Sequence, residues 1–193
     1  MHELARRSKG FTLVELMVTI AVVAILLAIA LPSFRNVIQR NRVASASNDL
    51  LASVSYARTT AINRGQLVSM CPSTDGASCT SAGKDFESGW IVYTYPAGAA
   101  SANTAYAAAT STLLRASGTH TGVSINAQQT GVITFGLQGQ LRPATALTFL
   151  TCSRTSSSGI GASTATVPGV QLDVNGSGSV SAKSLAAGDS CGT

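Results

Sequence analysis

The chain has 193 residues, of which 45% are apolar and 11% are charged. This apolar content excludes a globally disordered chain, and the low charge, against roughly 25% in an ordinary soluble domain, favours a membrane-inserted stretch, an exported protein or both. The formal net charge of +5 belongs to the first 64 residues, because basic and acidic side chains balance from residue 65 onward. The charge therefore gives no evidence for a nucleic-acid-binding domain.

The N-terminus joins a short basic segment, residues 1–10, to an almost wholly apolar run from Phe11 to Leu31. No charge lies between Glu15 and Arg35, so about 19 residues could span a bilayer as a helix. The basic segment would keep its end cytoplasmic. A secretory signal could be cut after Ala30, but a carboxylate such as Glu15 costs about 2.5–3.5 kcal/mol inside an apolar segment, and a disposable signal has no use for it.

The sequence Gly10-Phe11-Thr12-Leu13-Val14-Glu15 resembles a type IV prepilin cleavage site. The resemblance implies that prepilin peptidase removes a leader, residues 1–10, by cutting after Gly10, and that the new N-terminal Phe11 is methylated. It also implies that Glu15 acts in assembly, where its carboxylate neutralises the Phe11 amine of a neighbouring subunit inside an apolar filament core. Gly10 suits a cleavage site because it lets a protease approach the backbone closely.

A helical spacing of apolar residues continues beyond the membrane segment as far as Arg64. We expect one helix of about 54 residues and roughly 80 Å, with a hydrophobic transmembrane and assembly part at 11–34 and an amphipathic part at 35–64. Pro32 would kink this helix without ending it, and Gly65 would end it. The pattern favours a solvated helix face for five arginines; the alternative is that the first three lie near anionic headgroups or a neighbour's acids. These arginines are Arg35, Arg40, Arg42, Arg58 and Arg64.

The second part, residues 65–193, has short β-type runs separated by Gly, Ser and Asn. The stretches 97–112 and 153–166 are low in complexity, and we interpret them as loops on the outer surface. Asp173–Gly178 matches the first half of a calcium loop, but position twelve is Ser184 instead of glutamate, so the pattern favours a turn between strands. The expected strands are Leu67–Cys71, Trp90–Tyr95, Leu113–Arg115, Val123–Ile125, Val132–Phe135, Leu147–Cys152, Val170–Val174 and Ser179–Ser181.

Four segments in this half extend the resemblance to the GspH/FimT/FimU group of minor pilins and pseudopilins. They are Val68–Ser73, Ser88–Tyr93, Ile133–Phe135 with Gly139, and Leu147–Cys152. The group implies the α+β type IV pilin fold: a long N-terminal helix, transmembrane in its first half, packed on a C-terminal antiparallel β-sheet head. Trp90 is expected in the core of this head.

Composition argues against an enzyme, a metal site or a cofactor. A catalytic or metal constellation would depend on His120, because His2 lies in the leader. We interpret His120, beside Gly118 and Gly122, as a solvated loop residue. No catalytic residue is predicted, and the cysteines have neither CxxC spacing nor a histidine cluster, so no zinc site is predicted.

An even number of cysteines in an exported chain favours two disulfides, and three pairings are possible. Cys71–Cys79 would close a tight loop, and Cys152–Cys191 resembles the C-terminal disulfide loop of many type IV pilins. Chain entropy assigns them roughly 2.5 and 4 kcal/mol of stabilisation.

Three functions follow from the resemblance. The chain is most similar to a FimU-type minor pilin, a structural subunit that primes or caps type IV pilus assembly near the tip. The alternatives are a GspH-like minor pseudopilin of type II secretion and a FimT-like minor pilin that captures DNA. DNA is not expected, because Gly178-Ser179-Val180-Ser181 has serines where the DNA-binding members have arginines.

The resemblance also implies partners and a location. The partners are other minor pilins, the major pilin, prepilin peptidase and the inner membrane. Before assembly the chain would cross the inner membrane once, with its head in the periplasm. It would then enter the extracellular pilus, at the tip.

Overall fold

The computed structural model describes residues 10–80, 83–100, 102–129, 131–154, 156 and 159–192, apart from the side chain of Pro32. These residues divide into two compact units, the first ending at Val37 and the second starting at Ile38. The leader, residues 1–10, lies outside the described residues except for Gly10.

A single helix, α1, covers Leu13–Arg64, two residues shorter at its start than the expected 11–64. Its end lies at Gly65, as predicted. Gly65 has φ +59°, its amide donates to Ile62 O, and the Gln66 amide donates to Ala61 O. This hydrogen-bond pattern is a Schellman motif, in which glycine adopts the left-handed conformation without a Cβ clash.

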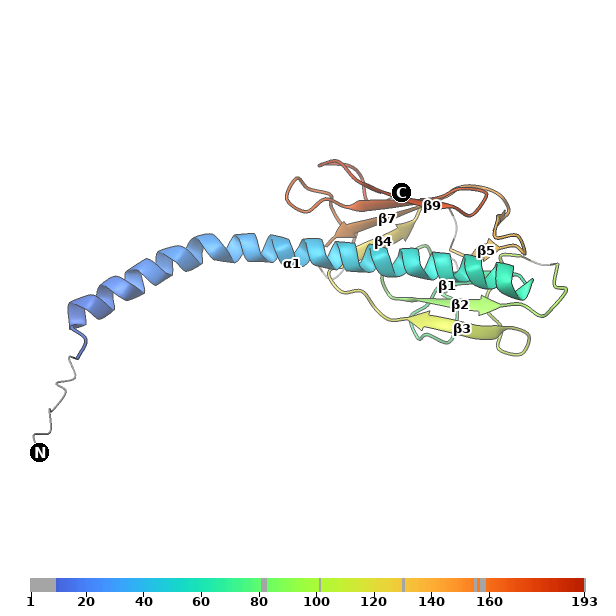
Figure 1. The fold of residues 1–193 in the computed structure, drawn as a ribbon, viewed down its shortest axis with the longest axis horizontal. Coiled ribbons are helices and arrows are strands. Elements are labelled where there is room, and N and C mark those ends of the chain that lie inside the picture. The colour runs from blue at the N-terminus through green and yellow to red at the C-terminus, as the bar shows by residue number, and fades with distance from the viewer. Residues whose placement is uncertain are drawn as a thin grey trace, which may run out of the picture. The chain divides into compact units, whose positions relative to one another are not determined.

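The described residues after the helix form nine strands in two antiparallel sheets (Figure 1). The order is β3-β2-β1-β5-β6 in the first sheet and β4-β7-β8-β9 in the second. All eight expected strands are present, and the two-residue β6 was not predicted. The strands are β1 Val68–Pro72, β2 Trp90–Thr94, β3 Thr112–Ser117, β4 Val123–Ala127, β5 Ile133–Phe135, β6 Leu141–Arg142, β7 Leu147–Ser153, β8 Val170–Val174 and β9 Val180–Ser184.

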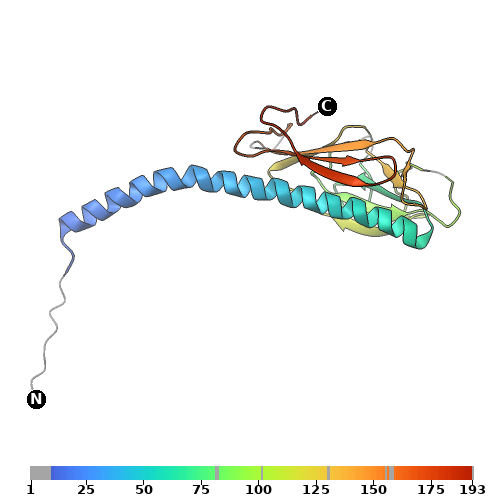
Figure 2. The ribbon, with the colours of Figure 1, turned by 45° about the horizontal axis from the view of Figure 1, so that its top comes forward.

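The C-terminal part of α1 runs along both sheets (Figures 1 and 2). The core of the second unit lies between this part of the helix and the sheets. Trp90 on β2, Phe149 on β7 and Leu172 on β8 belong to one buried cluster with the helix. Trp90 is fully buried, which confirms its predicted place in the core. The helix contributes one face, spaced by three or four residues: Val43, Ala46, Leu50, Val54, Ala57 and Ala61.

The opposite face of the first sheet has a smaller apolar cluster around Tyr93 and Tyr95. Tyr106, from the stretch expected to be a surface loop, packs edge-to-face on Tyr93 with ring centroids 5.4 Å apart. Both Tyr93 and Tyr95 donate hydrogen bonds to Thr104 O, and burial raises the pKa of Tyr93. The 97–112 stretch therefore covers the sheet as well as facing solvent, and its sequence hid this because its apolar side chains are few.

Candidate functional site

The start of α1 carries the motif that the sequence singled out. The Glu15 amide donates to Thr12 Oγ1 at 3.2 Å, so Thr12 caps the helix and Glu15 occupies its first turn. Thr12 and Glu15 have the spacing of a capping box, a signal that the sequence reasoning missed. A carboxylate in the first turn is also stabilised by the positive end of the helix dipole.

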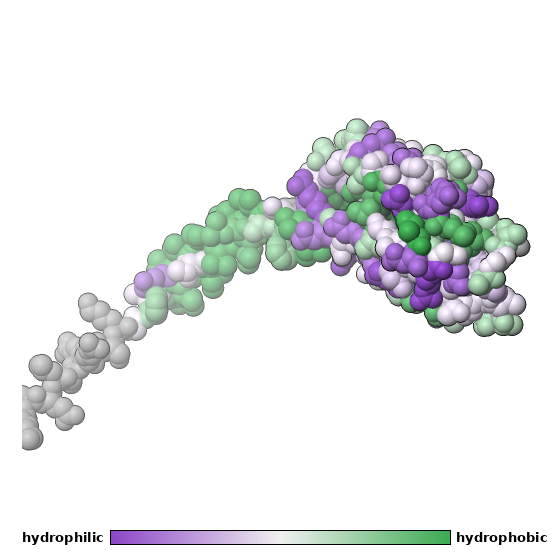
Figure 3. Space-filling view, turned by 45° about the vertical axis from the view of Figure 1, so that its right-hand side comes forward, coloured by the Kyte–Doolittle hydropathy of each residue, from purple (hydrophilic) through white to green (hydrophobic). Residues whose placement is uncertain are grey.

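The large side chains of the first unit form a continuous exposed apolar surface, green in Figure 3. Phe11 is 84% exposed, and Ile29 and Phe34 are 70% and 65% exposed. Helix α1 is long and apolar enough to cross a membrane. Apolar surface of this extent is covered in a functioning protein by lipid or by other helices.

Glu15 is the charged residue of the apolar stretch between Leu13 and Leu31, so its carboxylate needs a partner once that stretch is covered. Thr19 Oγ1 donates to Leu16 O at 2.8 Å, so that hydroxyl is satisfied within the helix. The Glu15 carboxylate forms no ion pair with any residue that the structure describes. Around Gly10 no atom lies within 4 Å of a Cβ built there, so crowding within the described chain does not require glycine.

Two of the five helix arginines also bond to the head: Arg40, which is exposed as expected, and Arg58, which is half-buried. Arg40 Nε donates to Thr166 O, and Arg58 donates to Gly139 O at 3.2 Å and to Ser177 O at 3.4 Å. Arg58 thereby ties the β5–β6 turn and the β8–β9 turn to α1. The sequence could not predict this, because the acceptors are backbone carbonyls more than 80 residues away along the chain.

The prediction that His120 is a solvated loop residue is wrong, because its side chain is 19% exposed. Its ring stacks on Trp90 with centroids 5.0 Å apart, and Nε2 lies 3.3 Å from Asp49 Oδ2. Asp49 accepts hydrogen bonds from Arg115 at 3.1 Å and from Ser117 at 2.6 Å. The group joins α1 to β3.

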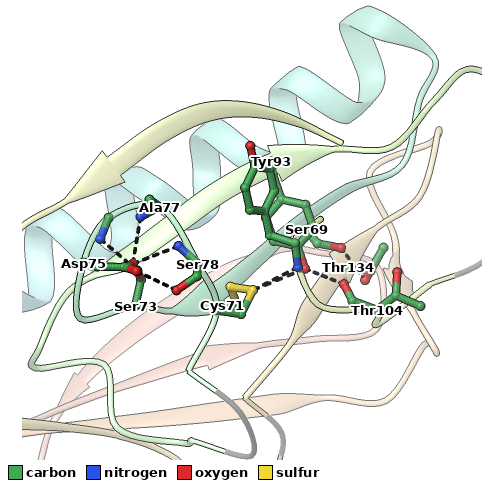
Figure 4. Close-up of a disulfide and its surroundings, with 12 residues drawn as sticks. Ser69, Cys71, Ser73, Asp75, Ala77, Ser78, Tyr93, Thr104 and Thr134 are labelled. Carbon is green, nitrogen blue, oxygen red and sulfur yellow. Dashed lines mark hydrogen bonds between the residues drawn. A yellow bond between two sulfur atoms is a disulfide. The ribbon is translucent and has the colours of Figure 1, made fainter. Parts of the chain in front are cut away.

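The loop after β1 is closed by a bond between Cys71 and Cys79, whose Cα atoms are 5.6 Å apart (Figure 4). Inside it, Asp75 accepts hydrogen bonds from the Ser78 hydroxyl, the Ala77 and Ser78 amides and the Ser73 hydroxyl. These bonds hold the pKa of Asp75 well below its usual range. A second bond joins Cys152 on β7 to Cys191, with Cα atoms 6.1 Å apart.

The half-match to a calcium loop is a hairpin turn between β8 and β9, with Val174 opposite Val180. Asn175 Oδ1 accepts from the Ser179 amide and Ser177 hydroxyl. Burial acts to raise the pKa of Asp173, but hydrogen bonds from Gln171 and Thr148 outweigh it, so the pKa is lowered. Among the described residues no group of three or more His, Cys, Asp or Glu side chains could hold a metal.

Comparison with known proteins gives two family matches. Residues 46–183 match the family described as type II transport protein GspH, and residues 5–31 match the prokaryotic N-terminal methylation motif. The chain is 48% identical to the type IV major alpha-pilin of Moraxella bovis over 44 residues, which are 23% of this chain and 28% of that protein. It is 33% identical to a fimbrial protein of Pseudomonas aeruginosa over 70 residues, or 36% and 46% of the two chains. The chain thus spans under half the length of these curated relatives.

Among solved structures, the chain is similar to the type IV minor pilin FimU of Pseudomonas aeruginosa strain PAO1. The TM-score is 0.54 at 22% identity, over 79% of this chain and 96% of that one. At this identity the likeness concerns the fold, and it confirms the predicted arrangement of a long N-terminal helix on antiparallel sheets.

Proposed function

Because the chain belongs to the GspH family of pilin-like proteins, we propose that it is a minor pilin, a structural subunit that primes or caps type IV pilus assembly near the tip. The observation that carries the proposal is the exposed apolar start of α1, which holds an unpaired Glu15 in its first turn. Such a segment is stable in a bilayer before assembly and among similar helices afterwards. Its neighbours would be other minor pilins and the major pilin.

Glu15 and Phe11 have complementary parts in this proposal. Cleavage after Gly10 by prepilin peptidase would leave a positive amine on Phe11, which is then methylated. Within an apolar bundle the amine and the carboxylate of adjacent subunits would neutralise each other, because an isolated buried charge is strongly unfavourable. The head would be periplasmic while the helix spans the inner membrane, and it would be extracellular in the pilus.

DNA capture is disfavoured by the geometry of the β8–β9 turn. Arg58 is one of two cations near this turn, and it already donates to Gly139 O and Ser177 O. Lys183 on β9 lies 3.6 Å from Asp173 Oδ2. Phosphate contacts need available cations, and the two beside this turn have partners. A pseudopilin of type II secretion would have the same exposed apolar helix and the same Glu15. The two functions differ in the filament that the subunit joins, a pilus or a pseudopilus.

A strain lacking this chain tests the proposal. Loss of surface pili in electron micrographs, restored by the wild-type chain, is the result expected of a priming pilin. Retained pili with lost protein secretion would favour the pseudopilin, and retained pili with lost DNA uptake would favour DNA capture. Either outcome contradicts priming.

The mature chain is expected to begin at Phe11 with one added methyl group, which mass spectrometry of the membrane-extracted protein measures. Gly10→Ala should process poorly and bulkier residues should block processing, because the peptidase must approach the backbone closely. Since Gly10 is uncrowded within the chain, its replacement should not disturb folding. An N-terminus after Ala30 would contradict this prediction and indicate an ordinary signal peptide.

Peptide mapping under non-reducing conditions is expected to join Cys71 to Cys79 and Cys152 to Cys191. A shortened chain that starts at Asn36, close to the boundary between the two units, should be soluble, monomeric and free of reactive thiols. Cys152→Ser should lower the free energy of unfolding by about 2–5 kcal/mol, because the open chain gains conformational freedom. A peptide that joins Cys71 to Cys152 would contradict the proposed pairing.

A further inference from the structure

Arg142 is a cation on the outer face of the first sheet. It ends β6 at the edge of that sheet, opposite Thr134, while its neighbour Leu141 pairs with Phe135. Successive strand residues point to opposite faces. Leu141 is buried in the core with Phe135, and Arg142 is therefore on the face away from α1, where it is exposed.

Arg142 separates two hollows in the surface. One has a volume of about 260 Å³, and its lining includes the aliphatic residues Val132, Leu141 and Leu147 together with the polar residues Asn103, Gln129, Thr134 and Thr145. The other has a volume of about 330 Å³ and is bounded by Leu67, between α1 and β1, and by Leu137. Each is many times larger than one water molecule requires. Arg142 lines both, and it is the charged residue among those that line either hollow.

The guanidinium of Arg142 has no hydrogen bond or ion pair with any residue that the structure describes. In contrast, Arg115 and Arg154 each lie 3.1 Å from a carboxylate oxygen. A guanidinium binds a carboxylate through two parallel hydrogen bonds. Arg142 is exposed beside the largely apolar 260 Å³ hollow, so its donors are available for such a pair.

We propose that this surface, Arg142 with the two hollows beside it, is a docking site for a segment of a neighbouring pilin subunit in which an aliphatic residue adjoins a carboxylate. The aliphatic side chain fills the 260 Å³ hollow, and the carboxylate binds Arg142. The charge selects an anion, and the aliphatic walls select a peptide over a nucleic acid, whose phosphates would find one cation and no aromatic platform in the lining. The identity of the partner as a pilin rests on the proposed function.

Peptide titration of the full processed chain in detergent micelles tests the site without relying on pilus assembly. The probes are acetyl-Gly-Gly-Val-Leu with a free carboxylate and the same peptide ending in a carboxamide. NMR of the labelled chain should show shifts centred on residues 132–147 with the carboxylate peptide, and about tenfold weaker binding of the carboxamide. Equal binding of the two peptides, binding of neither, or shifts centred elsewhere would overturn the proposal.

Arg142→Gln should weaken binding of the carboxylate peptide about tenfold and leave thermal unfolding unchanged, because the side chain is exposed and unpaired. The matched control is Arg64→Gln, in the last turn of α1, which removes an exposed arginine that lines neither hollow. Equal weakening by both variants would indicate a general charge effect and reject the site. If the deletion strain keeps its pili but the peptide binds as described, the proposed function fails and the docking site stands.

Discussion

Glu15→Val is expected to leave few or no surface pili while the processed protein stays at its normal level. Insertion into the membrane should be unaffected or favoured, because the variant removes the charge from the span. Cleavage should also persist, since Glu15 lies five residues beyond Gly10. Docking into the filament should fail, because the Phe11 amine of the adjacent subunit would be buried without a partner. Immunoblots of membrane fractions and electron microscopy of the same cells measure both quantities.

The structure supplies the controls that separate charge from helix capping. Glu15→Gln keeps a side chain that suits the third position of a capping box but removes the charge, so it should be as defective as Glu15→Val. Thr12→Ala removes the acceptor of the 3.2 Å cap and keeps the charge, so pili should remain. Normal piliation with Glu15→Val would contradict the pairing, and a defect with Thr12→Ala but not with Glu15→Gln would assign Glu15 to the cap.

Leu50→Ala is expected to lower the free energy of unfolding of the head by about 2–5 kcal/mol. Leu50 is fully buried in the cluster that joins α1 to both sheets, so its truncation removes apolar contact and leaves a cavity. Denaturant unfolding of the micelle-bound chain measures the change through the fluorescence of Trp90, the chain's one tryptophan, which lies in the same cluster.

Ile62→Ala is the matched control for this variant. Ile62 belongs to the same helix but is 47% exposed, so its truncation should cost well under the amount for Leu50. Equal losses from the two variants would contradict this prediction, because they would show that burial against the sheets does not determine the cost. A loss confined to Leu50 supports the helix as the central element of the core.

The strands show how local sequence limits prediction. Most of the eight expected strands were marked by several apolar or β-branched residues, but β6 is two residues long and has one apolar residue, Leu141. It forms because the Gly136–Gly139 turn returns the chain beside β5, with Phe135 opposite Leu141. Arg142, the centre of the proposed docking site, was therefore missed together with its strand.

The sequence alone determined the C-terminal end of the helix, the apolar segment and the motif from Gly10 to Glu15, because each depends on neighbours along the chain. Hydropathy, the Gly65 stop and the spacing of Thr12 and Glu15 are local properties. Tertiary structure decided the positions of Arg58, His120 and Arg142. Arg58 binds carbonyls brought beside α1 by two turns, His120 packs on Trp90, and Arg142 faces two hollows formed by separate segments. Contacts between residues distant in sequence exist only once both sheets are formed, so no local pattern could encode them.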